Sequence, residues 1–263
     1  MCLFRRFLLV SILFFPLSLY SLNSNAGEIC NSFTVNGDSN WYPFAYRTAD
    51  NKLIGTVPDA AHLALSRIGL KMDVQQDRPW KRILYDLEFG NIDIVLGAYW
   101  NADRAKKYHF SELLGTDEIR VFVKKGNEFA LKSFKDLIGK QGLILLGGSH
   151  GDEFDRFATK YLNFNEIPKN YQIIKMLSWG RADFGILGYI EGLQHIRDLG
   201  IEDQVVALPW PILSNGIYLM MNRSAPCAHR IKDLNASIQE LQKNGDLDQI
   251  FSEYLERDVN TPE

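Results

Sequence analysis

The hydrophobic positions along the chain follow two alternating patterns. Short runs rich in β-branched residues predict buried strands, and segments with apolar residues at positions 0, 3, 4 and 7 predict amphipathic helices. We expect strands at 33–37, 71–75, 92–96, 120–124, 142–146, 184–187, 205–208 and 216–221. We expect helices at 59–68, 80–87, 154–161, 171–179, 190–199, 231–241 and 249–255. Strands that alternate with helices favour an α/β fold with a mostly parallel sheet.

The first 26 residues have the pattern of a secretory signal peptide. Arg5 and Arg6 form a positive region, 7–15 is an apolar run, and cleavage is expected after Ala26. The apolar run is shorter than the ~20 residues of a membrane-spanning helix. Cys30 does not follow the small residues of a lipoprotein signal. We therefore expect a freely diffusing periplasmic protein.

Composition excludes several function classes. Without the leader the chain has 27 basic and 32 acidic residues, a formal net charge of −5, and no basic stripe that would indicate nucleic-acid binding. The five histidines show no metal-ligand spacing, and neither a Walker loop nor a dinucleotide fingerprint occurs. We expect no metal and no cofactor. The remaining 237 residues are enough for one large domain or two ordinary lobes.

The end of the predicted strand 92–96 carries the most informative chemistry. Gly97 and Ala98 remove side chains from its carboxyl end, and Arg104 follows shortly after. Ligands of open α/β sheets lie beyond the carboxyl ends of strands, and an arginine presents a planar fork of donors that suits a carboxylate. The segment therefore indicates a small acidic ligand. The alternative is a surface arginine on a polar helix.

The residues of this segment resemble a known family. Gly90-Asn-Ile-Asp93, the small residues at 97–98, Arg104 and Phe110-Ser111 are similar to the motif of the family 3 solute-binding proteins of bacterial ABC transporters, the polar amino-acid group. The resemblance implies a two-lobed periplasmic-binding-protein fold of type II, each lobe a mostly parallel sheet flanked by helices, with the ligand in the cleft between them. It implies lobe 1 at 27–121 and 212–263, and lobe 2 at 122–211 with hinge crossovers at its ends. Arg104 would grip the α-carboxylate of an amino acid.

Two further segments of the first lobe fit the resemblance. The stretch from Asp38 to Phe44 resembles the family's D-x-x-aromatic-x-P-F, in which Asp38 would contact the ligand and Trp41 would lie against it. Trp80 stands where the family places an apolar residue that leans into the cleft. The alternative roles are a turn cap for Asp38 and ordinary core packing for the two tryptophans.

The stretch from Gly147 to Phe154 resembles the second lobe's G-[ST]-x-x-x-x-F loop. Its hydroxyl and free N–H groups at a helix start would attract the same carboxylate, so Ser149 and Arg104 would clamp one anion from opposite lobes. His150 either faces the ligand or caps the helix.

The same loop matches the nucleophile elbow G-x-S-x-G between a strand and a helix. In that interpretation Ser149 would be a nucleophile, with Asp183 and either His195 or His229 as partners. Because the family loop explains the same residues without catalysis, the hydrolase is the weaker hypothesis.

The segment from Gly180 to Gly188 resembles a strand of the second lobe that ends, in amino-acid binders, with an aspartate for the α-ammonium. Gly188 stands at that place here. Either Asp38 or Glu191 supplies the charge, or the ligand is not an α-amino acid, because an unpaired ammonium in a desolvated cleft is costly. Tyr99 and Tyr189 lie at strand ends and would suit a bulky ligand.

Cys30 and Cys227 are the only cysteines outside the leader. An even pair in an oxidising compartment predicts a disulfide between the start of the first strand and the start of a late helix. Such a bridge needs Cα atoms within about 7 Å, so both chain ends would lie in one lobe. The alternative is two free, buried thiols.

We therefore expect a periplasmic binding protein of an ABC importer that holds a small carboxylated, amino-acid-like solute, acts as a monomer with a membrane permease as partner, and performs no covalent chemistry. One alternative is an enzyme on the same scaffold, similar to a cyclohexadienyl dehydratase, with Glu191 or Asp38 as a carboxylic acid in the cleft. The other is a sensory input to a membrane receptor.

Overall fold

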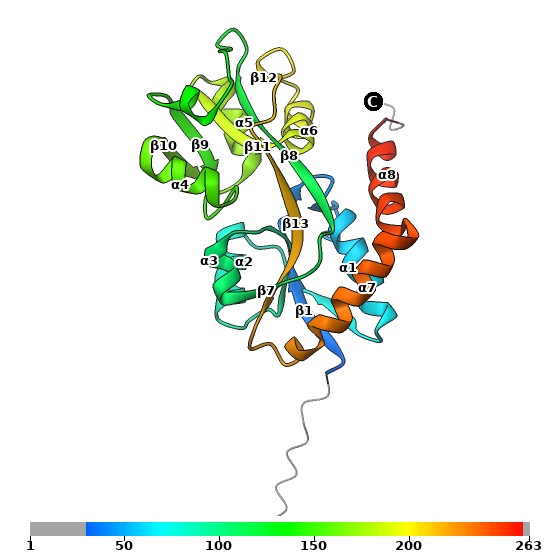
Figure 1. Ribbon diagram of the computed structural model, residues 1–263. Coiled ribbons are helices and arrows are strands. Elements are labelled where there is room, and N and C mark those ends of the chain that lie inside the picture. The colour runs from blue at the N-terminus through cyan, green and yellow to red at the C-terminus, as the bar shows by residue number, and fades with distance from the viewer. Residues whose placement is uncertain (1–29, 260–263) are drawn as a thin grey trace, which may run out of the picture.

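The structure, a computed structural model, describes residues 30–259 of the chain. It is an α/β fold of two lobes joined by two long strands (Figure 1). The two-lobed architecture expected from the sequence is confirmed. The expected signal peptide at 1–26 lies outside the described residues. No helix within 30–259 combines the length and the apolarity that crossing a bilayer requires.

Lobe 1 is built on three parallel strands in which the first strand pairs with both others. These strands are β1 (Ser32–Asn36), β5 (Lys71–Val74) and β6 (Ile94–Tyr99). The flanking helices are α1 (Thr56–Arg67), α2 (Trp80–Glu88), α3 (Ala102–Lys107), α7 (Ile231–Asn244) and α8 (Asp246–Val259). The shorter strands are β2 (Asn40–Trp41), β3 (Ala45–Arg47), β4 (Leu53–Ile54) and β7 (Tyr108–Phe110).

Lobe 2 repeats the arrangement with another set of three parallel strands. These are β9 (Gln141–Leu145), β10 (Asn163–Ile167) and β11 (Phe184–Gly188). Its other elements are α4 (Asp152–Tyr161), α5 (Asn170–Ser178), α6 (Tyr189–Leu199) and the short strand β12 (Val205–Ala207). Short 3₁₀ helices occupy Phe134–Leu137 in lobe 2 and Ala228–Arg230 in lobe 1.

Two crossover strands connect the lobes. β8 (Gly115–Lys124) and β13 (Leu213–Asn222) run antiparallel beside each other, and their neighbours are β11 on one side and β6 on the other. The strands therefore form one continuous order, β10-β9-β11-β8-β13-β6-β1-β5. Figure 1 shows both crossovers running between the lower and the upper lobe. The expected boundaries after residue 121 and before residue 212 lie in and beside these strands and stay a proposal.

Each lobe buries apolar side chains on both faces of its sheet. In lobe 1, Phe33 and Leu65 belong to the cluster under α1 and α7, while Ile83 and Leu87 of α2 pack on the opposite face. The spacing of the α2 residues puts them on one side of the helix, as the sequence predicts. In lobe 2, Phe154 of α4 lies on one face of the sheet, and α5 and α6 cover the other. Burying each such side chain contributes about 1.5–3 kcal/mol.

Among the local differences between prediction and structure, two have a clear physical reason. β10 was not expected, because its sequence Asn163-Phe-Asn-Glu-Ile is mostly polar; it is an edge strand with only its last residue buried, so it needs little apolar character. β6 continues to Tyr99 instead of ending before Gly97, because an irregularity in the pairing with β13 accommodates the positive φ of 93° at Gly97.

The predicted disulfide between Cys30 and Cys227 is confirmed, with Cα atoms 5.3 Å apart. It joins the residues just before β1 to the segment just before α7, so it ties the start and the late part of the described chain within lobe 1.

Candidate ligand-binding cleft

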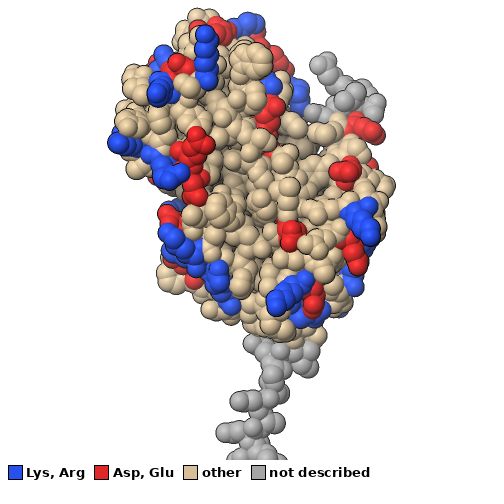
Figure 2. All heavy atoms as spheres, viewed as in Figure 1, with Lys and Arg blue, Asp and Glu red and all other residues tan. Residues whose placement is uncertain are grey.

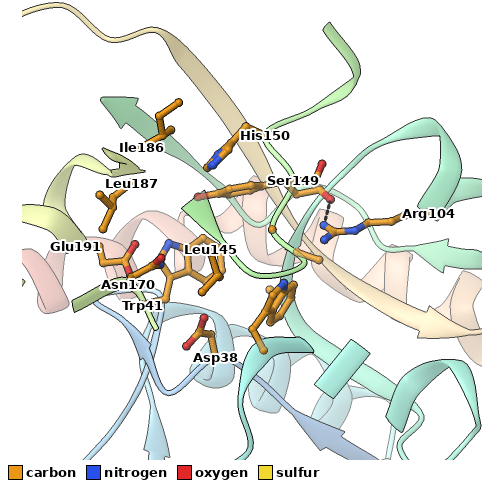
Figure 3. A pocket seen from close by; sticks show the side chains of 16 residues that line it. Asp38, Trp41, Arg104, Leu145, Ser149, His150, Asn170, Ile186, Leu187 and Glu191 are labelled. Carbon is orange, nitrogen blue, oxygen red and sulfur yellow. Dashed lines mark hydrogen bonds between the residues drawn. The ribbon is translucent and has the colours of Figure 1, made fainter. Parts of the chain in front are cut away.

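A cavity of about 520 Å³ lies between the lobes, and Figure 3 shows side chains that line it. Ten of the eleven predicted ligand-binding residues line it. The lining consists of Asp38, Trp41, Trp80, Gly97, Ala98, Tyr99, Arg104, Leu145, Gly148, Ser149, His150, Asn170, Ile186, Leu187, Gly188 and Glu191. The eleventh residue, Tyr189, lies outside the lining, and its ring packs 3.7 Å from the guanidinium of Arg120. Leu145, Asn170, Ile186 and Leu187 were not expected.

The lobe 1 wall of the cavity is a pair of aromatic rings fixed by one carboxylate. Trp41 and Tyr99 meet edge to face at 5.4 Å, and both donate to the Oδ2 of Asp117, at 2.9 Å from the indole and 2.6 Å from the phenol. Burial raises the pKa of the Asp117 carboxyl to about 7, against the lowering effect of these two bonds. The Trp41 ring rests on Gly97, where an added Cβ would come within 2.6 Å of it.

Asp38 stands directly after β1, and its carboxylate accepts a 2.9 Å bond from the backbone N–H of Asn40. Burial, followed by the negative charge of Glu191, raises the pKa of the Asp38 carboxyl to about 6.

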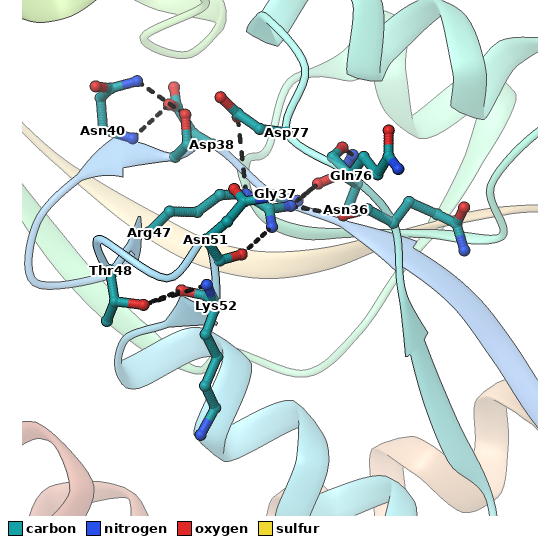
Figure 4. A network of polar contacts seen from close by, with 12 residues as sticks. Asn36, Gly37, Asp38, Asn40, Arg47, Thr48, Asn51, Lys52, Gln76 and Asp77 are labelled. Atoms are coloured by element: carbon teal, nitrogen blue, oxygen red, sulfur yellow. Dashed lines mark hydrogen bonds and ion pairs between the residues drawn. The ribbon is translucent and has the colours of Figure 1, made fainter.

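A hydrogen-bond network around Arg47 lies behind Asp38. The guanidinium of Arg47 donates to Asn36 Oδ1, the Gln75 carbonyl and the Asn51 carbonyl (Figure 4). This network holds the β2–β3 hairpin on the strand ends, which fixes where Asp38 lies.

Arg104 connects the two lobes at the other end of the cavity. It lies on α3, whose N-cap Asn101 accepts from the Arg104 backbone N–H at 2.7 Å. The guanidinium donates to the carbonyl oxygens of Tyr99 at 2.9 Å and of Gly147 at 3.3 Å, the latter in lobe 2. Burial lowers the pKa of Arg104, while the charge of Asp155 opposes that shift. The predicted arginine is thus a partly buried cation at the inter-lobe contact.

Ser149 and His150 lie just before α4, as predicted. The Ser149 hydroxyl accepts from Asn101 Nδ2 at 2.8 Å and donates to Asp155. The His150 ring is buried between Tyr99 and Phe154, and neither of its ring nitrogens has a hydrogen-bond partner among the described residues. Burial, together with the nearby charge of Arg104, lowers the pKa of His150 to about 4, so the imidazole is neutral at pH 7.

Glu191 and Asn170 form the lobe 2 wall opposite Asp38 (Figure 3). Glu191 is buried in the first turn of α6, and its Oε1 accepts from Asn170 Nδ2 at 2.6 Å and lies 3.4 Å from His195 Nε2. Glu191 is one of the two acidic residues that the sequence suggests for the ligand amine, whereas Asn170 was not expected. The only local signal for Asn170 is its position at the start of a helix.

The residues proposed for the hydrolase alternative do not form a catalytic triad. The Ser149 hydroxyl bonds to Asp155 and not to a histidine, His195 lies against Glu191, and Asp183 accepts from the backbone N–H of Gln141 at 2.7 Å. A nucleophile without a base within reach cannot be activated in that way. Within residues 30–259, no group of three or more histidine, cysteine, aspartate or glutamate side chains could hold a metal ion.

Charged side chains are mixed in sign over the face of the molecule shown in Figure 2. Lysine, arginine, aspartate and glutamate alternate around the rim of both lobes, while the centre of this view is mostly uncharged.

Comparisons with known proteins agree with this geometry. The family described as "Bacterial extracellular solute-binding proteins, family 3" matches residues 33–257. The L-cystine-binding protein TcyJ of Escherichia coli strain K12 is 26% identical over 221 residues, covering 82% of this chain and 80% of that protein. The probable amino-acid-binding protein YxeM of Bacillus subtilis strain 168 is 23% identical over 244 residues, covering 90% and 89%.

Solved structures show the same fold. An ancestral arginine-binding protein bound to arginine has a TM-score of 0.73 at 20% identity and covers 85% of this chain and 98% of that one. A histidine kinase sensor domain similar to periplasmic binding proteins has a TM-score of 0.74 at 18% identity, covering 85% and 96%. With a family match across nearly all of the described residues, this chain belongs to the bacterial extracellular solute-binding proteins, family 3.

Proposed function

We propose that this protein is the periplasmic binding component of an ABC importer and holds a small amino-acid-like solute, by its carboxylate, in the cavity between the lobes. The observation that carries the proposal is the position of Arg104. It is the only lysine or arginine among the residues that line the cavity, it is partly buried, and it contacts both lobes. A partly buried guanidinium at such a place suits a carboxylate ligand.

The second support comes from the helix start opposite Arg104. α4 begins directly after Ser149, His150 and Gly151, so its first N–H groups add a partial positive charge on the lobe 2 side, which the Asp155 carboxylate partly offsets by accepting from the His150 N–H at 2.9 Å. A carboxylate placed between them and Arg104 would contact both lobes at once. Because each lobe contributes part of the site, binding favours the closed arrangement over the open one.

The curated relatives support the ligand class. TcyJ is named for L-cystine, and YxeM is described as a probable amino-acid-binding protein. A family of extracellular solute-binding proteins supports delivery to a membrane permease from the periplasm. We propose that the protein acts as a monomer and transforms no substrate, in line with curated relatives that are named as binding proteins.

A thermal-shift screen with the twenty common L-amino acids, L-cystine and uncharged solutes of similar size tests this function. A ligand at about 100 times its Kd adds ~2.7 kcal/mol to the free energy of unfolding. For a protein of this size that corresponds to a rise in Tm of about 5–10 °C. Calorimetry should then give one site per chain. A panel without any amino-acid hit would contradict the proposal, and turnover of prephenate or arogenate would favour the dehydratase.

A further inference from the structure

A side chain at position 188 would collide with Asp117 unless that residue moved. A Cβ on Gly188 would lie 2.5 Å from Oδ2 and 3.0 Å from Oδ1 of Asp117, which is closer than side chains approach. The backbone at Gly188 has a φ of −55°, which any residue can adopt, so glycine is needed here for space and not for its conformational freedom. The end of β11 is therefore bare, and any group that binds the solute at this wall must come from elsewhere.

Asp117 itself is not free to bind a solute. Its side chain is buried behind Trp41 and Tyr99 and already accepts hydrogen bonds from both of them. It does not belong to the lining of the cavity. Asp117 lies on the crossover strand β8 and positions the two aromatic rings. Its carboxylate also occupies the space beside Gly188.

Two carboxylates of the lining remain, and they face each other across the cleft. Glu191 comes from the first turn of α6 in lobe 2 and Asp38 from the end of β1 in lobe 1. The negative charge of Glu191 contributes to the raised pKa of Asp38, so the two carboxylates lie close enough to repel each other. Two like charges brought together in a buried space are stabilised by a cation between them.

Asn170 lies beside Glu191 and has a buried polar atom without a partner. Its Nδ2 holds Oε1 of Glu191 at 2.6 Å, while its Oδ1 is buried without a hydrogen-bond partner among the described residues. The same Oε1 lies 3.4 Å from Nε2 of His195. A buried acceptor without a donor costs free energy, and a ligand N–H would satisfy it. This corner of the cavity therefore combines the carboxylate of Glu191 with the unpartnered carbonyl oxygen of Asn170.

We propose that Glu191, braced by Asn170, binds the ammonium group of the solute together with Asp38 from the opposite lobe. The inference rests on the proposed function, because it assumes that Arg104 holds the carboxylate of the same solute. The bound species is an amino acid with its charges separated along the cavity, its anionic end at Arg104 and its cationic end between Glu191 and Asp38.

A matched ligand pair tests the assignment. The probes are the amino acid with the largest thermal shift and its desamino carboxylic acid, which keeps the carboxylate and lacks the amine. Wild-type protein should bind the amino acid at least about 100-fold more tightly. In Glu191→Gln this preference should fall at least about 10-fold, because affinity for the amino acid drops while affinity for the desamino acid changes by less than about threefold. Glutamine preserves an acceptor for Asn170 Nδ2, so the ligand-free Tm should change little.

Two further variants complete the design. Glu202→Gln removes an exposed glutamate shortly after α6 and should leave both affinities unchanged. Asn170→Ala removes the unpartnered Oδ1 and the hydrogen bond to Glu191, and should lower the preference for the amine by about 3- to 10-fold. If Glu191→Gln fails to fold, the result with Asn170→Ala decides the question.

Each outcome has a distinct meaning. An unchanged preference for the amine in both Glu191→Gln and Asn170→Ala overturns the assignment. A wild-type protein that binds the desamino acid as tightly as the amino acid also overturns it, while leaving the carboxylate-binding function in place. If no amino acid binds, the proposed function fails and this inference fails with it.

Discussion

The indole N–H of Trp80 donates a hydrogen bond to the carbonyl oxygen of Gly147, 3.1 Å away, and so joins the first residue of α2 in lobe 1 to the loop after β9 in lobe 2. The same carbonyl oxygen accepts from the guanidinium of Arg104 at 3.3 Å. Two side chains of lobe 1 thus converge on one backbone group of lobe 2, and the lobes are in contact beside the cavity.

Trp80→Phe should weaken ligand binding about fivefold, because it removes one inter-lobe hydrogen bond worth ~1 kcal/mol in the closed form and keeps most of the apolar volume. Calorimetry measures the affinity, and small-angle scattering should show a larger open fraction without ligand. Trp179→Phe, at a half-exposed ring on lobe 2, is the control. Equal affinity in Trp80→Phe and wild type would show that this bond does not contribute to closure.

Arg104→Gln should lower affinity for any carboxylate ligand at least about 100-fold, since the anion would lose its charged, hydrogen-bonded partner in a buried site. Arg104→Lys should recover only part of this loss, because a lysine cannot replace the two-pronged contact. The matched control is Arg156→Gln on the exposed side of α4. Binding by Arg104→Gln at wild-type strength would refute the assignment of the carboxylate to this residue.

Gly188→Ala should destabilise the protein by about 1–3 kcal/mol, because the new Cβ overlaps the Asp117 carboxylate. In the double variant Asp117→Ser with Gly188→Ala the clash is relieved, so the two effects should be non-additive by at least about 1 kcal/mol. Urea unfolding of the wild type, both single variants and the double variant measures the four free energies of unfolding in this double-mutant cycle. A second cycle that pairs Asp117→Ser with Gly200→Ala, at a helix end with open space around it, should be additive.

The affinity for an amine-bearing ligand should depend on pH through Asp38. The pKa of this carboxyl is raised to about 6, so it is ionised at pH 7 and mostly protonated at pH 5. Only the ionised form attracts an ammonium, so affinity should fall about tenfold between pH 7 and pH 5. Asp38→Asn should bind more weakly at pH 7 and show a flatter profile. An identical pH profile in wild type and Asp38→Asn would exclude this role.

The free energy of unfolding of the ligand-free protein should depend on pH in the opposite direction to the ligand affinity. Because folding raises the pKa of Asp38 from 3.8 to about 6 and that of Asp117 from 3.8 to about 7, the folded state holds more protons than the unfolded state. The contribution of both groups to stability is therefore fully present below pH 4 and is lost as the pH rises towards 7. Asp117→Asn should flatten this part of the curve in urea unfolding experiments. A slope unchanged by the substitution would contradict the assignment.

Replacing both Cys30 and Cys227 with serine should lower the free energy of unfolding by about 2–5 kcal/mol, because the bridge closes a loop of 197 residues in the unfolded chain. Differential scanning calorimetry on the chain 27–263, with and without reductant, checks this. Denatured, unreduced wild-type protein should show no free thiol. Ligand affinity should be unchanged, since the bridge lies outside the lining of the cavity.

Much of the lobe 1 side of the cavity could be predicted because its signals are local. A β-branched run, a following pair of small residues and a nearby arginine place Gly97, Ala98 and Arg104 at one strand end without knowledge of distant contacts. The resemblance to the family placed Asp38 and Ser149 in the same way, because each lies in a short motif directly after a strand. Helix faces such as that of α2 were predictable for the same reason.

What the sequence determined by itself is therefore the set of strands, helices and strand-end motifs, since hydrophobic periodicity and turn chemistry act over a few neighbouring residues. Only the tertiary structure decided which groups meet across the cleft. Asp117 fills the space at Gly188, Asn170 braces Glu191, and Tyr189 turns to Arg120. These contacts depend on how two crossover strands set one lobe against the other, and no local pattern encodes the distance between segments that are far apart in the chain.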